Sequence, residues 1–233
     1  MTAPQFKGFA PEAFAFFDEL YFTQERAWFQ AHKAIYDKAV KAPMLDLLAD
    51  LSAELARRKV PLQADPKRAI FRIHRDVRFA RDKRPYKTHI GAVLTRDGSK
   101  QSPGLLYVHI DPTGSWAGSG FYHLADDTLA AMRARIATRP KDFRQMVAAL
   151  GKTELALSPD EDALKRKPKG FDAVTDADLI DALCRRSLIL RQPLSREEVS
   201  GPAVIARLAD FAVASLPLLD FGWQALGYPL KAE

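Results

Sequence analysis

The stretch AIFRIHRDVRF, residues 69–79, marks the point where the hydrophobic period of this sequence changes from helical to alternating. Its apolar residues Phe71, Ile73, Val77 and Phe79 alternate with polar residues, as expected of a half-buried strand. Arg75 interrupts the apolar side, which predicts a bend or a bulge at that position. The stretch therefore predicts the first strand of a sheet.

Three further strands are expected downstream, around residues 89–95, 105–110 and 115–122. Turn-forming residues separate them, including Asp97, Gly98 and the run from Asp111 to Gly114. The connections are too short for crossover helices, so the strands are expected to form an antiparallel meander. Together these segments predict a sheet of about four strands over roughly residues 69–122.

Helical spacing of apolar residues appears on both sides of the predicted sheet. Phe14, Phe17 and Leu20 recur at helical spacing after Pro11, which suits a first helical turn. Residues 11–60 are therefore expected to be helical, and so are residues 125–228. Because the sequence shows no internal repeat and no long linker, one α+β domain over residues 1–233 is predicted.

The composition excludes several classes of protein. At 47% hydrophobic residues, the chain of 233 residues has enough apolar material for a core, unlike a disordered chain. The single cysteine, Cys184, excludes an intrachain disulfide scaffold. No apolar run approaches the ~18 residues of a membrane span, and the first residues do not resemble a signal peptide. The sequence predicts a cytoplasmic protein with no membrane partner, and it does not indicate an oligomeric state.

The excess positive charge of the chain is concentrated in one segment. The net charge is +6, and the segment from Arg72 to Lys87 holds seven basic and two acidic residues, a net of +5. The rest of the chain, with 28 basic and 27 acidic residues, is nearly neutral. A local excess of this kind indicates an anionic partner.

The same segment carries a long signature that runs from Phe71 to His89. The sequence resembles the domain-of-unknown-function family 2461, whose pattern is Arg-x-x-Arg-Asp-x-Arg-Phe followed by Asp-Lys-x-Pro-Tyr-Lys. The pattern falls on Arg72, Arg75, Asp76, Arg78, Phe79, Asp82, Lys83, Pro85, Tyr86 and Lys87. Trp28-Phe29, Gly118-x-Gly120-Phe-Tyr and Lys167-Pro-Lys-Gly-Phe171 are also similar to the family, so the resemblance covers nearly the whole chain. It implies a one-domain architecture and no particular activity.

Arginine side chains in this segment suggest an anion site. Arginine presents a planar fork of donors that suits phosphate and carboxylate groups. On an extended strand, alternate residues project to one side, so several forks are expected to converge on one hollow. The predicted ligand-binding residues are Arg72, Arg75, Arg78, Lys83, Tyr86 and Lys87. Asp76 and His74 are the predicted proton carriers if the protein is an enzyme acting on a phosphorylated small molecule or nucleotide; no cofactor is implied.

Two alternatives to a small-molecule anion site remain open at this point. Basic residues interleaved with Phe71, Phe79 and Tyr86 would suit a nucleic-acid partner, through phosphate contacts and base stacking. The apolar alternation argues against this, because it predicts that the phenylalanines are buried. Alternatively, the arginines form a purely structural network of ion pairs, in which Asp76 and Asp82 are the acidic partners.

A metal site is a sharper alternative. His74-x-Asp76 and His109-x-Asp111 are both His-x-Asp pairs on predicted strands, and His89 or His123 would complete a set of ligands. The arginines around the first pair would repel a dication, and Asp111 begins a predicted turn. For these reasons the sequence prediction includes no metal ligand.

A second basic run, from Lys165 to Lys169, is expected to be a solvated loop. The sequence does not indicate whether this run joins the anion site.

Overall fold

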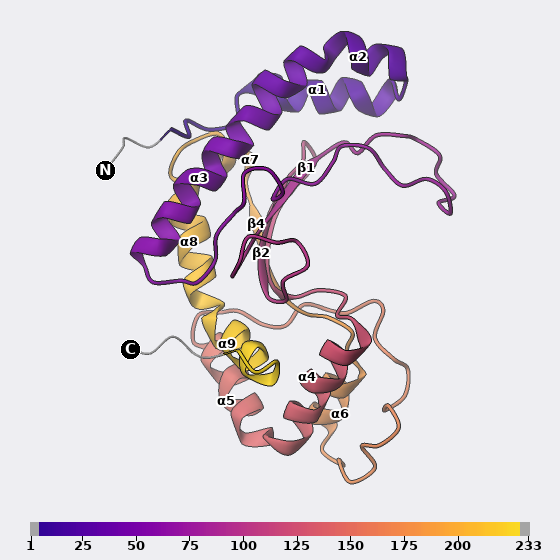
Figure 1. Cartoon of the computed structure of the whole chain (residues 1–233), viewed down its shortest axis with the longest axis vertical. Helices are drawn as coiled ribbons and strands as arrows, with labels where there is room; N and C mark the ends of the chain where they lie inside the picture. The colour runs from indigo at the N-terminus through magenta and orange to yellow at the C-terminus, as the bar shows by residue number, and fades with distance from the viewer. Residues whose placement is uncertain (1–4, 229–233) are drawn as a thin grey trace. The chain divides into compact units, whose positions relative to one another are not determined.

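The computed structural model describes residues 5–228 and contains a four-stranded antiparallel sheet (Figure 1). The strands are β1 (Ile90–Thr95), β2 (Leu105–Ile110), β3 (Ser115–Phe121) and β4 (Leu188–Leu194), in the spatial order β1-β2-β3-β4. Helices precede the sheet, and further helices lie before and after β4 in the chain. The predicted α+β class with a sheet of about four strands is confirmed.

The structure differs from the prediction in which segments form the sheet. Residues 69–79 are not a strand, and they contribute only isolated bridges, at Ile70 to Ala92 and at His74 to Tyr86. The chain leaves the sheet after Ile70, and the His74–Tyr86 bridge joins the two arms of a separate ribbon, so the rest of the alternating stretch meets no strand of the sheet. The fourth strand, β4, comes instead from residues that were expected to be helical. Its consecutive apolar residues Leu188, Ile189 and Leu190 are compatible with either a helix or a strand.

Strand β1 is at the edge of the sheet but is buried along its whole length. Gln63 forms an antiparallel bridge with Thr95, and Ile70 forms one with Ala92, so the preceding chain covers this edge. Exposed strand edges invite pairing with other chains, and this cover removes most of the edge. Strand β2 alternates between half-buried and buried residues, so one of its faces is accessible.

The described residues divide into two compact units, each made of segments that are discontinuous in sequence. The first unit contains residues up to 102 together with 106–117 and 192–210. The second contains residues 103–105, 118–191 and those from 211 onward. Strands β3 and β4 each pass from one unit to the other along the chain. The expectation of one domain stays a prediction.

The first unit begins with the helices predicted for residues 11–60. They are α1 (Pro11–Phe22), α2 (Arg26–Ile35), the π-helical segment η1 (Tyr36–Lys41) and α3 (Ala42–Arg57), and the short α7 (Arg196–Val199) follows β4. The helical spacing of Phe14, Phe17 and Leu20 is confirmed, because all three side chains are buried. Burial also raises the pKa of Tyr36 to about 12. An aromatic core therefore holds these helices together.

The second unit contains α4 (Asp126–Thr138), α5 (Pro140–Gly151), α6 (Ala177–Cys184) and α9 (Leu216–Ala225), while α8 (Val204–Ala214) passes between the units along the chain. The side chain of Trp223 is fully buried, and its Nε1–H donates to the carbonyl of Pro103 at 3.0 Å. None of the helices within residues 5–228 has the length and apolar character needed to cross a membrane.

Candidate functional site

The signature segment forms a narrow doubled ribbon, residues 70–89, that runs out from the start of β1 (Figure 1). Its two arms are joined by backbone hydrogen bonds from Arg75 N–H to the Pro85 carbonyl and from Lys87 N–H to the Ile73 carbonyl, each 2.8 Å long. The bridge between His74 and Tyr86 lies between them in sequence. The ribbon is therefore a hairpin-like extension rather than part of the sheet.

The tip of the ribbon, residues 76–84, is its most exposed part. Arg78 pairs with Asp76 at 2.7 Å, and this ion pair lowers the pKa of the Asp76 carboxyl. The Nζ of Lys83 donates to the Val77 carbonyl at 3.0 Å. The side chain of Phe79 is 95% exposed, contrary to the expectation that it would be buried. Two of the cations at the tip thus already have local partners.

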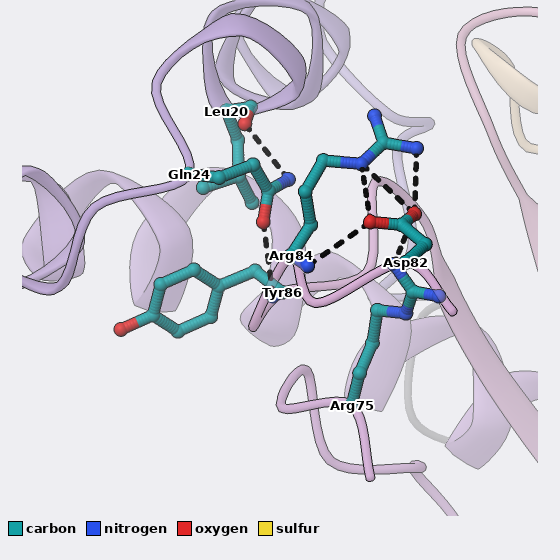
Figure 2. Close-up of polar contacts among 6 residues, drawn as sticks. All are labelled: Leu20, Gln24, Arg75, Asp82, Arg84 and Tyr86. Carbon is teal, nitrogen blue, oxygen red and sulfur yellow. Dashed lines mark hydrogen bonds and ion pairs between the residues drawn. The ribbon is translucent and has the colours of Figure 1, made fainter. Parts of the chain in front are cut away.

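Asp82 is shared by two arginines (Figure 2). Its Oδ2 lies 2.7 Å from Nη1 of Arg75 and 2.8 Å from Nη2 of Arg84. Hydrogen bonds from Arg84 and Arg75 lower the pKa of the Asp82 carboxyl well below its usual value. The carboxylate therefore stays ionised and holds both guanidinium groups in place.

The predicted arginines are brought together only in part. Arg75 and Arg84 both pair with Asp82, although Arg84 was not among the predicted ligands. Arg78 pairs with Asp76 instead. His74 is exposed and packs against Tyr86, with the ring centroids 5.2 Å apart. The binding and proton-transfer roles of these residues stay predictions.

The helical pair α1–α2 anchors the ribbon through Gln24 (Figure 2). Gln24 Oε1 accepts from the backbone N–H of Tyr86, and its Nε2 donates to the Leu20 carbonyl, both at 3.0 Å. The Tyr86 ring is 3% exposed and stacks on Phe29 with 4.6 Å between ring centroids. Tyr86 thus fastens the second arm of the ribbon to the helical core.

A hollow of about 290 Å³ lies between this anchor and the ribbon. Its lining contains three cations, Arg75, Arg84 and Lys87, and a single carboxylate, that of Asp82. The remaining lining residues are Tyr21, Gln24, Tyr86, Thr88 and His89. The hollow therefore has more positive than negative charge and several polar side chains.

Lys87 differs from Arg75 and Arg84 because it has no acidic partner in the part of the chain that the structure describes. Among residues 5–228, neither Lys87 nor Lys100 forms an ion pair, and both ammonium groups face the ring of Phe71, at 5.6 and 4.6 Å from its centroid. Burial, and then the charge of Arg72, lowers the pKa of Lys87. Burial, and then the charge of Lys87, lowers the pKa of Lys100. Lys87 is therefore repelled by two neighbouring cations, Arg72 and Lys100.

Sequence reasoning missed Lys100, since nothing in its local sequence distinguishes it. Its Nζ donates to the Ile70 carbonyl at 2.7 Å, which directs the ammonium group toward the base of the ribbon. We call Phe71, Arg72, Lys87 to Gly91 and Lys100 the base of the ribbon.

The accessible face of β2 adds aromatic and imidazole groups next to this base. Tyr107 lies 6.0 Å from Phe71 and 5.0 Å from Trp116, measured between ring centroids. His89 and His109 are 4.2 Å apart by the same measure. A signal for this face was present in the sequence, because Tyr107 and His109 alternate with apolar residues of β2. Burial, and then the charge of Lys87, lowers the pKa of His89.

These observations define an α+β protein with a cation-rich hollow beside a ribbon, and residues of both the tip and the base of the ribbon line this hollow. The sequence matches the family described as Conserved hypothetical protein (DUF2461) over residues 12–221, and the chain belongs to this family. No curated protein and no solved structure matches the chain.

Proposed function

We propose that the hollow beside Lys87 binds a small anion that carries a phosphate or carboxylate group. The observation that carries the proposal is the ammonium group of Lys87, which lines the hollow, is partly desolvated, and lacks an acidic partner among residues 5–228. An anion placed there would relieve the repulsion between Lys87, Arg72 and Lys100.

The two arginines in the wall of the hollow support the same proposal. Each guanidinium has five N–H donors, and Asp82 occupies only part of this set in Arg75 and Arg84. Asp82 thereby fixes the orientation of both guanidinium groups in the wall of the hollow. Preorganised donors bind an anion more tightly because fewer rotamers must be ordered on binding.

The more specific proposal is that the protein is an enzyme that acts on a phosphorylated small molecule or a nucleotide. His74 and Asp76 remain the predicted proton carriers. The pairing of Asp76 with Arg78 keeps the carboxylate ionised and also makes it a weaker proton acceptor. A cytoplasmic location is kept as part of the proposal.

Nucleic-acid association is a second candidate, and one observation favours it. Phe79 is 95% exposed at the tip, with the Arg78 guanidinium 5.9 Å from its ring centroid. An exposed aromatic ring beside a cation is the arrangement on which a single-stranded base stacks. This candidate places the binding residues at the tip rather than in the hollow.

A thermal-shift screen tests the two candidates together, with inorganic phosphate, pyrophosphate, sugar phosphates, nucleotides, dicarboxylates and a single-stranded oligonucleotide. A ligand that binds only the folded protein raises its midpoint of unfolding. We expect a small phosphate or carboxylate to raise the midpoint of the wild type and to have a much smaller effect on Lys87→Met. If only the oligonucleotide raises the midpoint, and Phe79→Ala abolishes that rise, the anion-site proposal is wrong.

A further inference from the structure

Three metal-ligating side chains meet where β1 begins and β2 ends. His89 immediately precedes β1, His109 lies in β2, and Asp111 follows the last residue of β2. Because β1 and β2 are antiparallel neighbours, the start of one lies beside the end of the other. The topology therefore brings together residues that are about twenty positions apart in the sequence.

The spacing of their ligand atoms is compatible with one bound ion. One ligand atom from each of the three residues lies within 4.8 Å of the others, and all three residues are half-buried. His109 Nε2 and Asp111 Oδ2 are 3.7 Å apart, which is too long for a hydrogen bond. Two ligands of a tetrahedral ion with bonds of about 2.0–2.1 Å lie roughly 3.4 Å apart, so the His109–Asp111 pair needs only a small contraction, while the wider spacing within the trio requires a larger movement on binding.

The imidazole of His109 is oriented by its neighbours. The Tyr107 hydroxyl lies 2.9 Å from Nδ1 of His109, and the indole of Trp116 stacks on the ring with 5.2 Å between centroids. A hydrogen bond at Nδ1 leaves Nε2, the nitrogen that faces Asp111, as the ligand atom. Gly91 makes room for this arrangement, since a Cβ there would lie 2.3 Å from the Tyr107 hydroxyl oxygen.

The carboxylate of Asp111 is also fixed, with its two oxygens in different roles. Oδ1 accepts hydrogen bonds from the backbone N–H and the hydroxyl of Thr113, at 2.7 and 2.6 Å. Oδ2 is the oxygen that faces His109. The predicted turn at Asp111 was a reason to expect no metal ligand there. In the structure the turn occupies only Oδ1 of Asp111, and Oδ2 is directed toward His109.

Other His–Asp combinations in the described part of the chain lack this convergence. His123 and Asp162 approach to 3.3 Å on an exposed surface, but no third ligand group joins them. Asp76 is paired with Arg78, and His74 packs against Tyr86. The charge that opposes a cation at the half-buried trio is Lys87, which acts on His89 from two residues away in the sequence.

We propose that His89, His109 and Asp111 bind a divalent transition-metal ion, with Zn²⁺ as the probe. Two imidazoles and one carboxylate are the donor set of metal sites that keep a coordination position open for water or another ligand. The site shares His89 with the lining of the proposed anion hollow, but its ligands do not include the guanidinium groups there, and it does not require an anion to be bound.

The test is a calorimetric titration of Zn²⁺ into the chelator-treated full chain. We expect one equivalent to bind, with affinity reduced at least about 100-fold by His109→Ala or Asp111→Asn and about 10-fold by the positioning change Tyr107→Phe. Asparagine keeps an acceptor for Thr113, so Asp111→Asn is expected to retain the turn. Circular dichroism of the metal-free variants checks that each one folds.

The matched control is His123→Ala, which removes a histidine that faces an aspartate outside the trio and is expected to leave Zn²⁺ affinity within a factor of two. Co²⁺ provides a second readout, because its visible absorption spectrum reports coordination by imidazole and carboxylate groups. The proposal is overturned if no Zn²⁺ binds, or if His123→Ala weakens binding as much as the changes within the trio do. Unchanged Co²⁺ spectra in His89→Gln and His109→Ala would overturn it as well.

Discussion

The tip and the base of the ribbon contain similar residues but use them in different ways. At the tip, Arg78 and Asp76 neutralise each other in solvent, and Lys83 bonds to a backbone carbonyl. At the base, Lys87 and Lys100 are partly desolvated and have no acidic partner among residues 5–228. The density of charge along the sequence therefore marks the segment, while burial and pairing decide which of its charges are available to a ligand.

Tyr86 and Phe79 show the same contrast in packing, and they give the largest expected effect. Tyr86→Ala removes a ring that is 3% exposed and stacked on Phe29, so we expect it to lower the free energy of unfolding by about 3 kcal/mol. Phe79→Ala removes a ring that is 95% exposed and should change that free energy by less than about 0.5 kcal/mol. Urea denaturation of the two variants measures both values.

If Phe79→Ala proved as destabilising as Tyr86→Ala, the tip would be packed in solution, and the comparison between tip and base would fail. A wild-type-like Tyr86→Ala would show instead that Gln24 and the backbone bridges hold the ribbon without the ring.

Substitution of Asp82 and of Asp76 compares the hollow with the exposed tip in anion affinity. Asp82→Asn removes the negative charge of the single carboxylate that lines the hollow and keeps an oxygen that accepts from Arg75 and Arg84, so we expect the affinity for pyrophosphate to rise roughly threefold to tenfold. Asp76→Asn removes the matched charge at the tip and should leave the affinity unchanged. Calorimetric titration of both variants measures the difference. A loss of affinity in Asp82→Asn would mean that its role in holding Arg75 and Arg84 outweighs its charge.

The sequence was sufficient to predict the parts of the fold that rest on local periodicity. Helical spacing after Pro11 predicted the first helix, and three of the expected strands correspond to β1, β2 and β3. The stretch 69–79 was wrongly assigned as a strand, because alternation shows which side chains are apolar but not whether a partner strand exists. Strand β4 was missed because Leu188 and its apolar neighbours also continue the helical pattern around Cys184.

The candidate site was predictable only where its residues are contiguous. The signature identified Lys87 and Arg75 because they lie within the basic segment. Lys100 reaches the base through a bond to Ile70, thirty residues away, and no local pattern reveals such an approach. The His109-x-Asp111 pair was visible in the sequence, but its proximity to His89 depends on the pairing of β1 with β2.

Lys100 and Lys83 provide a further comparison with a smaller expected effect. Lys100→Met removes a cation near Lys87 without removing a group that lines the hollow, so we expect pyrophosphate affinity to fall about twofold to threefold. Lys83→Met, the matched change at the tip, should have no effect at physiological ionic strength, where distant exposed charges are screened. Titration of pyrophosphate into the two lysine variants at the same salt concentration measures this difference. Equal losses of affinity in the two variants would indicate a general electrostatic attraction by the basic segment rather than a localised site.

The smallest expected effect is the pH dependence of the Asp82 ion pairs. Because hydrogen bonds from Arg84 and Arg75 lower the pKa of Asp82 below its ordinary value of 3.8, the contribution to stability is complete above that value and is lost as the pH falls below it. The difference in unfolding free energy between wild type and Asp82→Asn should therefore be constant from pH 7 to about 5 and shrink at lower pH. If the unfolding free energies of wild type and Asp82→Asn already converge between pH 7 and pH 5, the pairing of Asp82 with Arg75 and Arg84 is contradicted.

One experiment tests whether a cation at the base of the ribbon binds an anion while a paired cation at the tip does not. Pyrophosphate is titrated calorimetrically into wild type, Lys87→Met and Arg78→Met at the same ionic strength. We expect pyrophosphate to bind to the wild type, the affinity to fall at least about tenfold in Lys87→Met, and the affinity to change less than about twofold in Arg78→Met. Equal or greater loss in Arg78→Met, or no binding to the wild type, would contradict it.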